Sequence, residues 1–274
     1  MKLSAFTDEI NPDPARAVQL AAAWNIPCVE VRSLPNGRFP MVTDAELEEF
    51  HKIVTGAGLS VSGVSPGFCK CPVDDPSVPQ TIAEGLPRAC EWAQRWGTDL
   101  VSCFAFVRDD SPSVPVAVVE RMAQIAEITA QNGCRLVLEN EAACWGATGL
   151  EAAEIIRQIG SDQFTLLWDP GNSARAGSTC PYPDEYEQLK DLVTHVHIKN
   201  FDPATGQWSL MEKGVVDWPA QFAALKRDQY DGFVVIETHL RISPDEFAVV
   251  DDDLDALEAN SRRNLDYLRT LVDL

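Results

Sequence analysis

Four short apolar runs in the second half of the chain constrain its fold most strongly, because each ends in side chains that are able to bind a metal ion. The runs cover residues 135–141, 164–172, 195–199 and 233–239. Each is rich in leucine or β-branched residues, and helix-length sequence separates it from the next, which is typical of buried parallel strands. In parallel α/β barrels, functional side chains lie at the carboxyl ends of the strands. The sequence therefore predicts a barrel whose chemistry is gathered at one end.

The same alternation of strand-like and helix-like segments runs through the first half of the chain. Further strands are predicted at 2–10, 27–33, 59–65 and 99–106. With the four later runs they give eight strand and helix pairs at about 30-residue spacing, the pattern of an α/β protein with a (β/α)8 TIM barrel. We therefore predict a single TIM-barrel domain over residues 1–274. An open doubly wound sheet is the main alternative, but no GxGxxG sequence follows the first strand.

Local signals predict where some helices bend, end and begin. Pro87 lies inside a predicted helix and is expected to kink it. Gly160 is expected to end the helix that precedes the sixth strand. Residues 202–217 are predicted as a polar loop. The acidic residues 251–253 are expected to open the last helix, since negative charge is favourable at a helix N-terminus.

The charge and hydropathy of the chain exclude some partners. Acidic residues outnumber lysine and arginine by 42 to 22, which gives a formal net charge of −20. Such a surface repels phosphate backbones, so nucleic acid is not expected as a partner. No apolar run approaches the roughly 20 residues that span a bilayer, so no membrane partner is expected. The N-terminal segment becomes polar too early for a signal peptide, and the protein is predicted to be cytoplasmic.

Eight cysteines are scattered along the chain. Several lie in apolar segments, where cysteine behaves as a small buried hydrophobic residue. There is no CxxC pair, and the closely spaced Cys69 and Cys71 lack a matching second pair. The sequence therefore predicts neither a disulfide framework nor a zinc ribbon.

Side chains alternate between the two faces of a strand, so candidate ligands can be assigned to shared faces. His195, His197 and Lys199 share one face of their strand, stacked from the interior towards the mouth of the barrel. The other three runs end in carboxylates. The residues expected to converge near the mouth are Glu139, Asp169, His197 and Glu237.

One imidazole and three carboxylates are a suitable donor set for one divalent ion such as Mn²⁺, Mg²⁺, Co²⁺ or Zn²⁺. Buried carboxylates without a cation repel one another and lose their hydration. Taken singly, a carboxylate at a strand end is more often a helix cap or ion-pair partner, and a strand histidine is more often a core residue. The prediction of a metal site rests on four consecutive strands that share the pattern.

These runs resemble the xylose isomerase-like barrel superfamily, which contains sugar isomerases, 3-epimerases and inosose-type dehydratases. The matching stretches are Leu138-Glu139-Asn140, Trp168-Asp169-Pro170-Gly171-Asn172, His195-Val196-His197-Ile198-Lys199 and Tyr230 to Glu237. The likeness extends over essentially the whole chain and is strongest from 135 to 240. The Asp-Pro-Gly-Asn and His-x-His-x-Lys motifs in this order are fairly specific for the superfamily and say little about the substrate.

The resemblance implies a ligand set and a mechanism. In the superfamily, residues corresponding to the four candidate ligands named above hold one divalent metal. In its epimerases, two metal-bound glutamates on opposite faces of the substrate also move a proton, a role that falls here to Glu139 and Glu237. A metal that binds a ketose carbonyl and its neighbouring hydroxyl acidifies the α-proton, and a carboxylate on each face can remove and return it.

Further positions are expected around the substrate. Lys199 is expected to contact a substrate hydroxyl or an enolate oxygen, and the alternative is a surface ion pair. Glu141 and Trp145 are expected to line the pocket. Asn172 is counted among the substrate-binding residues, although some epimerases carry a histidine there, which argues against a simple free-ketose epimerase. His239 is expected to contact the substrate.

Two residues of the candidate site have structural alternatives. Arg32 is expected to bind a phosphate or carboxylate of the substrate, and the alternative is an ion pair with Glu30. His195 is expected to support the metal site from behind or to pack in the core.

Three functions remain in competition. The first is a metal-dependent isomerase or epimerase that acts on a sugar or sugar phosphate by α-proton abstraction through an enediolate. The second is a metal-dependent dehydratase of a keto-polyol such as an inosose or a dehydroshikimate-like acid. A repair endonuclease is disfavoured by the net charge of −20 and by a total of four histidines. The expected partner is a small carbohydrate, and the sequence leaves a homo-oligomer open.

Overall fold

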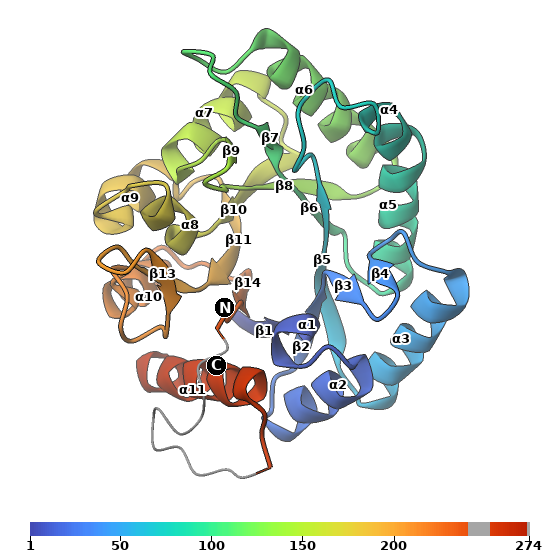
Figure 1. Cartoon of the computed structure of the whole chain (residues 1–274), viewed down its shortest axis with the longest axis vertical. Helices are drawn as coiled ribbons and strands as arrows, with labels where there is room; N and C mark the ends of the chain where they lie inside the picture. Colours follow the sequence, from blue (N-terminus) through green and yellow to red (C-terminus); the bar gives the residue numbers. More distant parts are fainter. Residues whose placement is uncertain (241–252, 273–274) are drawn as a thin grey trace.

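The protein folds as a closed barrel of eight parallel strands, which confirms the predicted (β/α)8 TIM barrel (Figure 1). The structure is a computed structural model that describes residues 1–240 and 253–272. The barrel strands are β1 (Lys2–Phe6), β2 (Cys28–Val31), β5 (Ser60–Phe68), β6 (Leu100–Cys103), β8 (Arg135–Glu139), β10 (Phe164–Trp168), β11 (Val193–Ile198) and β14 (Phe233–Ile236).

The strands pair in the order β1-β14-β11-β10-β8-β6-β5-β2, and β1 also pairs with β2, which closes the barrel. All of these pairings are parallel, so the carboxyl ends of the strands lie at one end of the barrel. The register sets Leu167 beside Glu139, and it sets His197 beside Val235. The four runs that end in candidate ligands are therefore immediate neighbours in the barrel wall.

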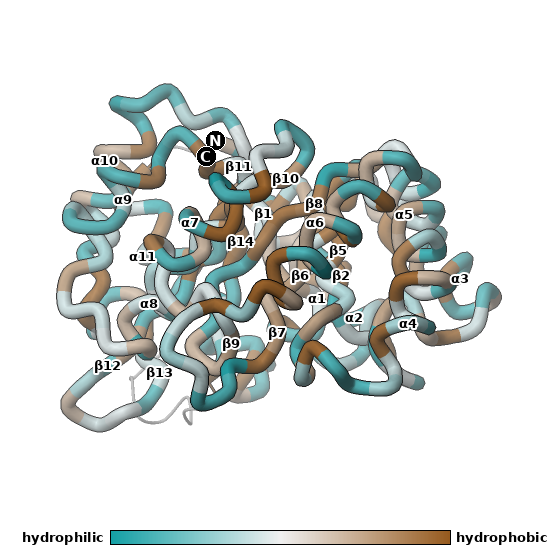
Figure 2. Tube along the Cα trace, turned by 90° about the horizontal axis from the view of Figure 1, so that it is seen from above, coloured by the Kyte–Doolittle hydropathy of each residue, from teal (hydrophilic) through white to brown (hydrophobic). Residues whose placement is uncertain are grey.

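Helices form the outer ring around the strands (Figure 1). They are α1 (Thr7–Ile10), α2 (Pro14–Ala23), α3 (Asp44–Gly56), α4 (Val78–Gln80), η1 (Thr81–Gly85), α5 (Leu86–Arg95), α6 (Val116–Gln131), α7 (Gly149–Ile159), α8 (Pro170–Arg175), η2 (Pro181–Glu185), α9 (Tyr186–Leu189), α10 (Trp218–Arg227) and α11 (Ala256–Leu271). Their apolar side chains also pack against one another, as where Phe50 of α3 and Trp92 of α5 both contact Trp96. Apolar stretches follow much of the barrel wall in Figure 2, whereas many outer loops are hydrophilic. Within the described residues, no helix has the length and apolar character needed to cross a membrane.

Several predicted helix boundaries agree with the structure. Gly160 ends α7 in the left-handed conformation with φ 68°. A π-helical turn, η1, directly precedes Pro87 in α5, so the expected irregularity falls just before the proline. The last helix begins one turn later than predicted, with a capping box between Asp255 and Glu258. Of the acidic stretch expected to open it, residues 251 and 252 lie outside the described residues.

Three predicted segments are wrong in detail. The first strand ends at Phe6 rather than residue 10, because Thr7–Ile10 turns into α1 and buries Glu9 against Arg32 and His239. The fourth strand is broken at Phe104, after which β7 (Ala105–Val107) pairs with β9 (Cys144–Trp145). The polar loop contains an antiparallel hairpin of β12 (Asn200–Asp202) and β13 (Gln207–Ser209). The first two departures depend on contacts between residues distant in the sequence, whereas the hairpin is local.

Candidate metal centre

The carboxylates of Glu139, Asp169 and Glu237 and the imidazole of His197 converge at the carboxyl ends of β8, β10, β11 and β14. Each offers one ligand atom, and the four atoms lie within 4.8 Å of one another. All four residues are buried, with Asp169 and His197 completely inaccessible to solvent. The structure thus brings together the four side chains that the sequence predicted as metal ligands.

The Asp-Pro-Gly-Asn motif builds the turn that presents Asp169. The Asp169 carboxylate caps α8, where its Oδ1 accepts a hydrogen bond from the Asn172 backbone N–H at 2.8 Å. A Cβ atom on Gly171 would lie 2.8 Å from Cγ of Lys199, so only glycine fits between the turn and this lysine. The Asn172 side chain donates to Oε1 of Glu139 at 3.1 Å. Asn172 is fully buried behind the ligands and is not one of the residues that line the cleft described below.

His197 is oriented by a buried carboxylate from the opposite side of the barrel. Its Nε2 lies 3.1 Å from Oε1 of Glu30, and Nε2 of His195 lies 2.6 Å from Oε2 of the same residue. Ser65 donates to Oε1 of Glu30 at 2.7 Å. Burial would raise the pKa of Glu30, but the two histidines hold this pKa below its usual range. His195 therefore supports the metal site from behind, which is one of the two roles predicted for it.

With its Nε2 directed at Glu30, His197 presents Nδ1 to the other ligands. Nδ1 lies 3.5 Å from Oε1 of Glu139 and 3.5 Å from Oε2 of Glu237. It has no hydrogen-bond partner within the described residues. A buried ring nitrogen left without a partner and aimed at two carboxylates is in a suitable position to bind a cation.

Lys199 supplies a positive charge inside this acidic group. Its Nζ lies 2.8 Å from Oδ2 of Asp169, 2.8 Å from Oε2 of Glu237 and 3.9 Å from Oε1 of Glu139. Only 3% of the side chain is exposed, so the alternative of a surface ion pair is wrong. Burial would lower the pKa of Lys199, but Asp169 and Glu237 raise it, and the lysine therefore remains charged.

Lys199 alone does not neutralise the three carboxylates around it, and Arg32 and His239 contact only Glu237 among them. The pKa of Asp169 is raised to about 6, chiefly by burial and further by the charges of Glu139 and Glu237, although Lys199 opposes the shift. This shift is the expected result of grouping carboxylates away from water. The excess negative charge and the free Nδ1 of His197 together fit a divalent cation bound among these four side chains.

Glu237 is held by cations on both of its oxygens. Arg32 Nη1 and His239 Nε2 each lie 2.8 Å from Oε1, while Lys199 contacts Oε2. Burial would raise the pKa of Glu237, but Lys199 and His239 bring it well below its usual range. In turn, burial would lower the pKa of His239, but its contacts with Glu237 and Glu9 raise the pKa to about 9. Glu237 is thus fixed in its ionised form.

Arg32 lines the cleft, but its guanidinium already contacts three carboxylates. Besides Glu237, it contacts Asp8 at 2.9 Å and forms a close ion pair with Glu9. The alternative ion pair between Arg32 and Glu30 is wrong, because Glu30 faces the two histidines in the barrel interior. The short helix α1, which the sequence did not predict, supplies both Asp8 and Glu9.

A cleft of about 230 Å³ opens above the ligand group. Its lining residues are Phe6, Arg32, Arg38, Ser65, Lys70, Ser102, Phe104, Glu139, Glu141, Lys199, Glu237 and His239. Glu141 and His239 therefore lie where substrate-binding residues were predicted. Trp145 does not line this cleft, since it is 3% exposed and packs against the Arg108 guanidinium, 4.8 Å from its ring centre.

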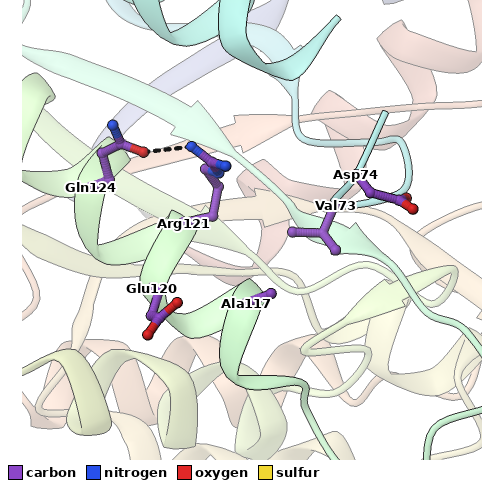
Figure 3. Close-up of a pocket in the computed structure, with 6 residues that line it drawn as sticks. All are labelled: Val73, Asp74, Ala117, Glu120, Arg121 and Gln124. Carbon is purple, nitrogen blue, oxygen red and sulfur yellow. Dashed lines mark hydrogen bonds between the residues drawn. The ribbon is translucent and has the colours of Figure 1, made fainter. Parts of the chain in front are cut away.

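A second depression, of about 370 Å³, lies away from the ligand group (Figure 3). It is formed by the loop after β5 and by α6, and Figure 3 shows Arg121 turned towards Gln124 in it, with a hydrogen bond of 2.7 Å. None of the four candidate ligands lines it. The ligand group therefore opens into the smaller cleft at the barrel mouth and not into this depression.

A closed parallel barrel with a buried group of one imidazole and three carboxylates at its strand ends defines a TIM-barrel protein with a candidate divalent-metal centre. The chain belongs to the xylose isomerase-like TIM barrel family, whose sequence model matches residues 18–271. An uncharacterized protein of Methanocaldococcus jannaschii is 24% identical over 119 residues, and the match covers 42% of this chain and 41% of that protein.

Solved structures share the fold over almost the whole chain. The probable 3-DHS dehydratase AsbF of Bacillus anthracis has a TM-score of 0.76 at 17% identity, covering 98% of this chain and 99% of that one. D-allulose 3-epimerase from Methylomonas sp. has a TM-score of 0.74 at 16% identity, with coverage of 99% and 98%. The IOLI protein, solved with a bound zinc atom, has a TM-score of 0.77 at 16% identity and covers both chains fully (100%).

Proposed function

We propose that the protein is a divalent-metal-dependent isomerase or epimerase of a sugar or sugar phosphate that works by α-proton abstraction through an enediolate. The observation that carries the proposal is the grouping of Glu139, Asp169, His197 and Glu237 at the floor of a cleft. Both glutamates also line that cleft, so they reach the space a substrate would occupy. The fold shared with D-allulose 3-epimerase is compatible with this reaction.

The metal would be held by the carboxylates of Glu139, Asp169 and Glu237 and by Nδ1 of His197. When bound, a divalent ion polarises a carbonyl and its neighbouring hydroxyl, which acidifies the proton on the α-carbon. Asp169 and His197 are completely buried and serve only to hold the ion. The identity of the metal among Mn²⁺, Mg²⁺, Co²⁺ and Zn²⁺ is not specified by this donor set.

The surroundings of Glu139 and Glu237 determine which of the two glutamates acts as the base. Glu139 receives one amide hydrogen bond from Asn172 and lies 3.9 Å from Lys199, whereas Glu237 contacts three cationic side chains. Because these cations stabilise the ionised form of Glu237, Glu139 is the stronger base of the two. Glu139 therefore removes the proton, and Lys199 stabilises negative charge that develops on the neighbouring substrate oxygen.

A dehydratase that acts on a keto-polyol is the second candidate, and His239 is the observation that favours it. His239 lines the cleft, with Nε2 2.8 Å from Glu237 and Nδ1 2.9 Å from Glu9. After the same α-proton abstraction, a cationic imidazole at the cleft wall can protonate a departing β-hydroxyl. The shared fold of the probable 3-DHS dehydratase is compatible with this alternative.

The first expected result is that purified protein binds one divalent ion per chain. Among the described residues at the ends of β8, β10, β11 and β14, four buried donors lie close enough together to bind one ion. Metal analysis after dialysis against Mn²⁺, Co²⁺, Mg²⁺ or Zn²⁺ measures the stoichiometry. Wild-type protein that retains none of the four ions would remove the metal from the proposal.

Solvent exchange tests the proposed reaction itself. In D₂O, metal-loaded protein is expected to place deuterium at the α-carbon of a ketose or ketose phosphate that it accepts, as measured by NMR or mass spectrometry. An isomerase or epimerase retains all of the substrate hydroxyls, whereas a dehydratase releases water and forms an enone. A complete absence of exchange and of product across ketoses, ketose phosphates and inososes would contradict both candidates.

A further inference from the structure

The cationic side chains of the cleft differ in one respect, which is whether a carboxylate accompanies them. Arg32, Lys70, Lys199 and His239 each lie within 2.9 Å of at least one carboxylate oxygen. Arg38 also lines the cleft, yet it forms no ion pair with any described residue. Arg38 is an exposed residue, so its charge is accessible to a ligand that enters the cleft.

The guanidinium of Arg38 is held in place by backbone carbonyl groups. Arg38 ends the hairpin of β3 (Ser33–Leu34) and β4 (Gly37–Arg38). Its Nε donates to the Pro66 carbonyl at 2.9 Å, and its Nη2 donates to the Ser65 carbonyl at 3.3 Å. These neutral acceptors orient the side chain, and neither of them carries a negative charge that would pair with the guanidinium.

Gly67 provides the surface on which this guanidinium lies. Its φ is +75°, and a Cβ atom there would lie 2.6 Å from Nε and 2.7 Å from Cζ of Arg38. Any other residue would therefore displace the arginine and would also be strained in this backbone conformation. The end of β5 thus supplies two carbonyl acceptors and a flat contact for one cation.

Among the described residues, the carboxylates nearest to Arg38 act on it from a distance and do not form an ion pair with it. Partial burial and the positive charge of Arg32 lower the pKa of Arg38, whereas the nearby charges of Asp8, Glu139 and Glu237 act in the opposite direction. Nη1 of Arg38 has no hydrogen-bond partner in the part of the chain that the structure describes. A guanidinium with a fixed orientation and a free edge is suited to bind carboxylate or phosphate oxygens.

We propose that Arg38 forms an anion subsite of the cleft, so that the substrate is a polyhydroxy ketone with a carboxylate or phosphate group. Its keto end lies at the ligand group and its acidic group lies at Arg38. The inference rests on the proposed function only in assuming that the substrate is a ketone. Binding of an anion at Arg38 can be measured without turnover. It reassigns to Arg38 the anion recognition that the sequence predicted for Arg32.

The test measures how inorganic phosphate and acetate each bind to Mg²⁺-loaded protein. Phosphate represents a phosphorylated substrate, and acetate represents a substrate with a carboxylate. Dissociation constants are measured by NMR titration for wild type, Arg38→Met and Arg38→Lys. The matched control is Arg121→Met, which removes an arginine that lines the second depression (Figure 3). Circular dichroism and thermal melting confirm that each variant is folded.

Wild type is expected to bind phosphate or acetate. Arg38→Met is expected to weaken the affinity for that anion roughly tenfold or more, because charge-assisted hydrogen bonds are lost. Arg38→Lys keeps the charge and is expected to give an intermediate value, while Arg121→Met matches wild type. The anion that shows the larger dependence on Arg38 identifies the acidic group of the substrate. Equal binding by wild type and Arg38→Met, or no binding of either anion, would overturn the subsite.

The solvent-exchange assay keeps this inference separate from the proposed function. D-fructose, D-fructose 6-phosphate and D-fructuronate share one ketose framework and differ in the group at the sixth carbon. If anion binding depends on Arg38 but no ketone exchanges its α-proton, the subsite stands and the proposed function fails. If D-fructose exchanges as fast as both charged ketoses in wild type, the function stands and the subsite is refuted.

Discussion

Replacement of Glu139 by glutamine is expected to reduce α-proton exchange by about 10²- to 10⁴-fold, the usual contribution of a general base. Glutamine keeps the size of the side chain and an oxygen ligand, but it cannot accept the proton. The amide of Asn172 continues to face the same oxygen position, 3.1 Å away in the wild-type protein. Part of the metal affinity should therefore survive, and saturating metal should not restore the rate.

The measurement is the single-turnover exchange rate in D₂O at saturating metal, together with the metal dissociation constant of each variant. Glu237→Gln is the informative comparison, because it also removes a carboxylate that contacts Arg32 and His239. It is expected to lose thermal stability as well as rate, since Arg32, Lys199 and His239 each lose a charged partner. Glu127→Gln, at an exposed position on α6, controls for the loss of one negative charge.

Near-normal exchange rates in both Glu139→Gln and Glu237→Gln would leave the metal centre intact but would eliminate proton transfer by these two carboxylates. A rate that returns to the wild-type value on addition of metal would show that the glutamate acts only as a ligand. His197→Ala provides the reference for that behaviour, because its loss should weaken metal binding without removing a base.

The ligand group was predictable because its signals are local in the sequence. Strand periodicity places His195, His197 and Lys199 on one face, and the parallel order of β8, β10, β11 and β14 follows from the repeating strand and helix pattern. The end of each strand then gives one ligand. The α7 boundary followed from Gly160 for the same reason, since one residue determines the helix end.

The supporting residues were not predictable, because their partners come from remote parts of the chain. Glu30 lies 165 residues before His195, and the two meet only when the barrel closes. One available signal was a single carboxylate in the short apolar strand Cys28–Val31, since a buried charge requires a partner. Arg38 gave no such signal, because its role depends on a hairpin and on the carbonyl groups at the end of β5.

Replacement of Glu30 by glutamine is expected to weaken metal binding by roughly 10- to 100-fold, the usual effect of removing a carboxylate that orients a metal-binding histidine. Glu30 accepts from both imidazoles, with 2.6 Å to His195 Nε2 and 3.1 Å to His197 Nε2. A glutamine offers one acceptor and one NH₂ group, so at least one imidazole would face a donor. If that ring is His197, its proton moves to Nδ1 and the nitrogen that faces the carboxylates can no longer bind a cation.

Co²⁺ titration followed by visible absorption measures both the affinity and the geometry of the site without any substrate. Glu30→Gln should raise the dissociation constant and change the Co²⁺ spectrum, whereas a change that only loosened the fold would lower the melting temperature without altering the spectrum of bound metal. Ser62→Ala is the matched control, since it removes a buried hydrogen bond to Ser4 in the same barrel interior. Glu30→Gln protein that binds Co²⁺ with wild-type affinity and spectrum would show that Glu30 does not position His197.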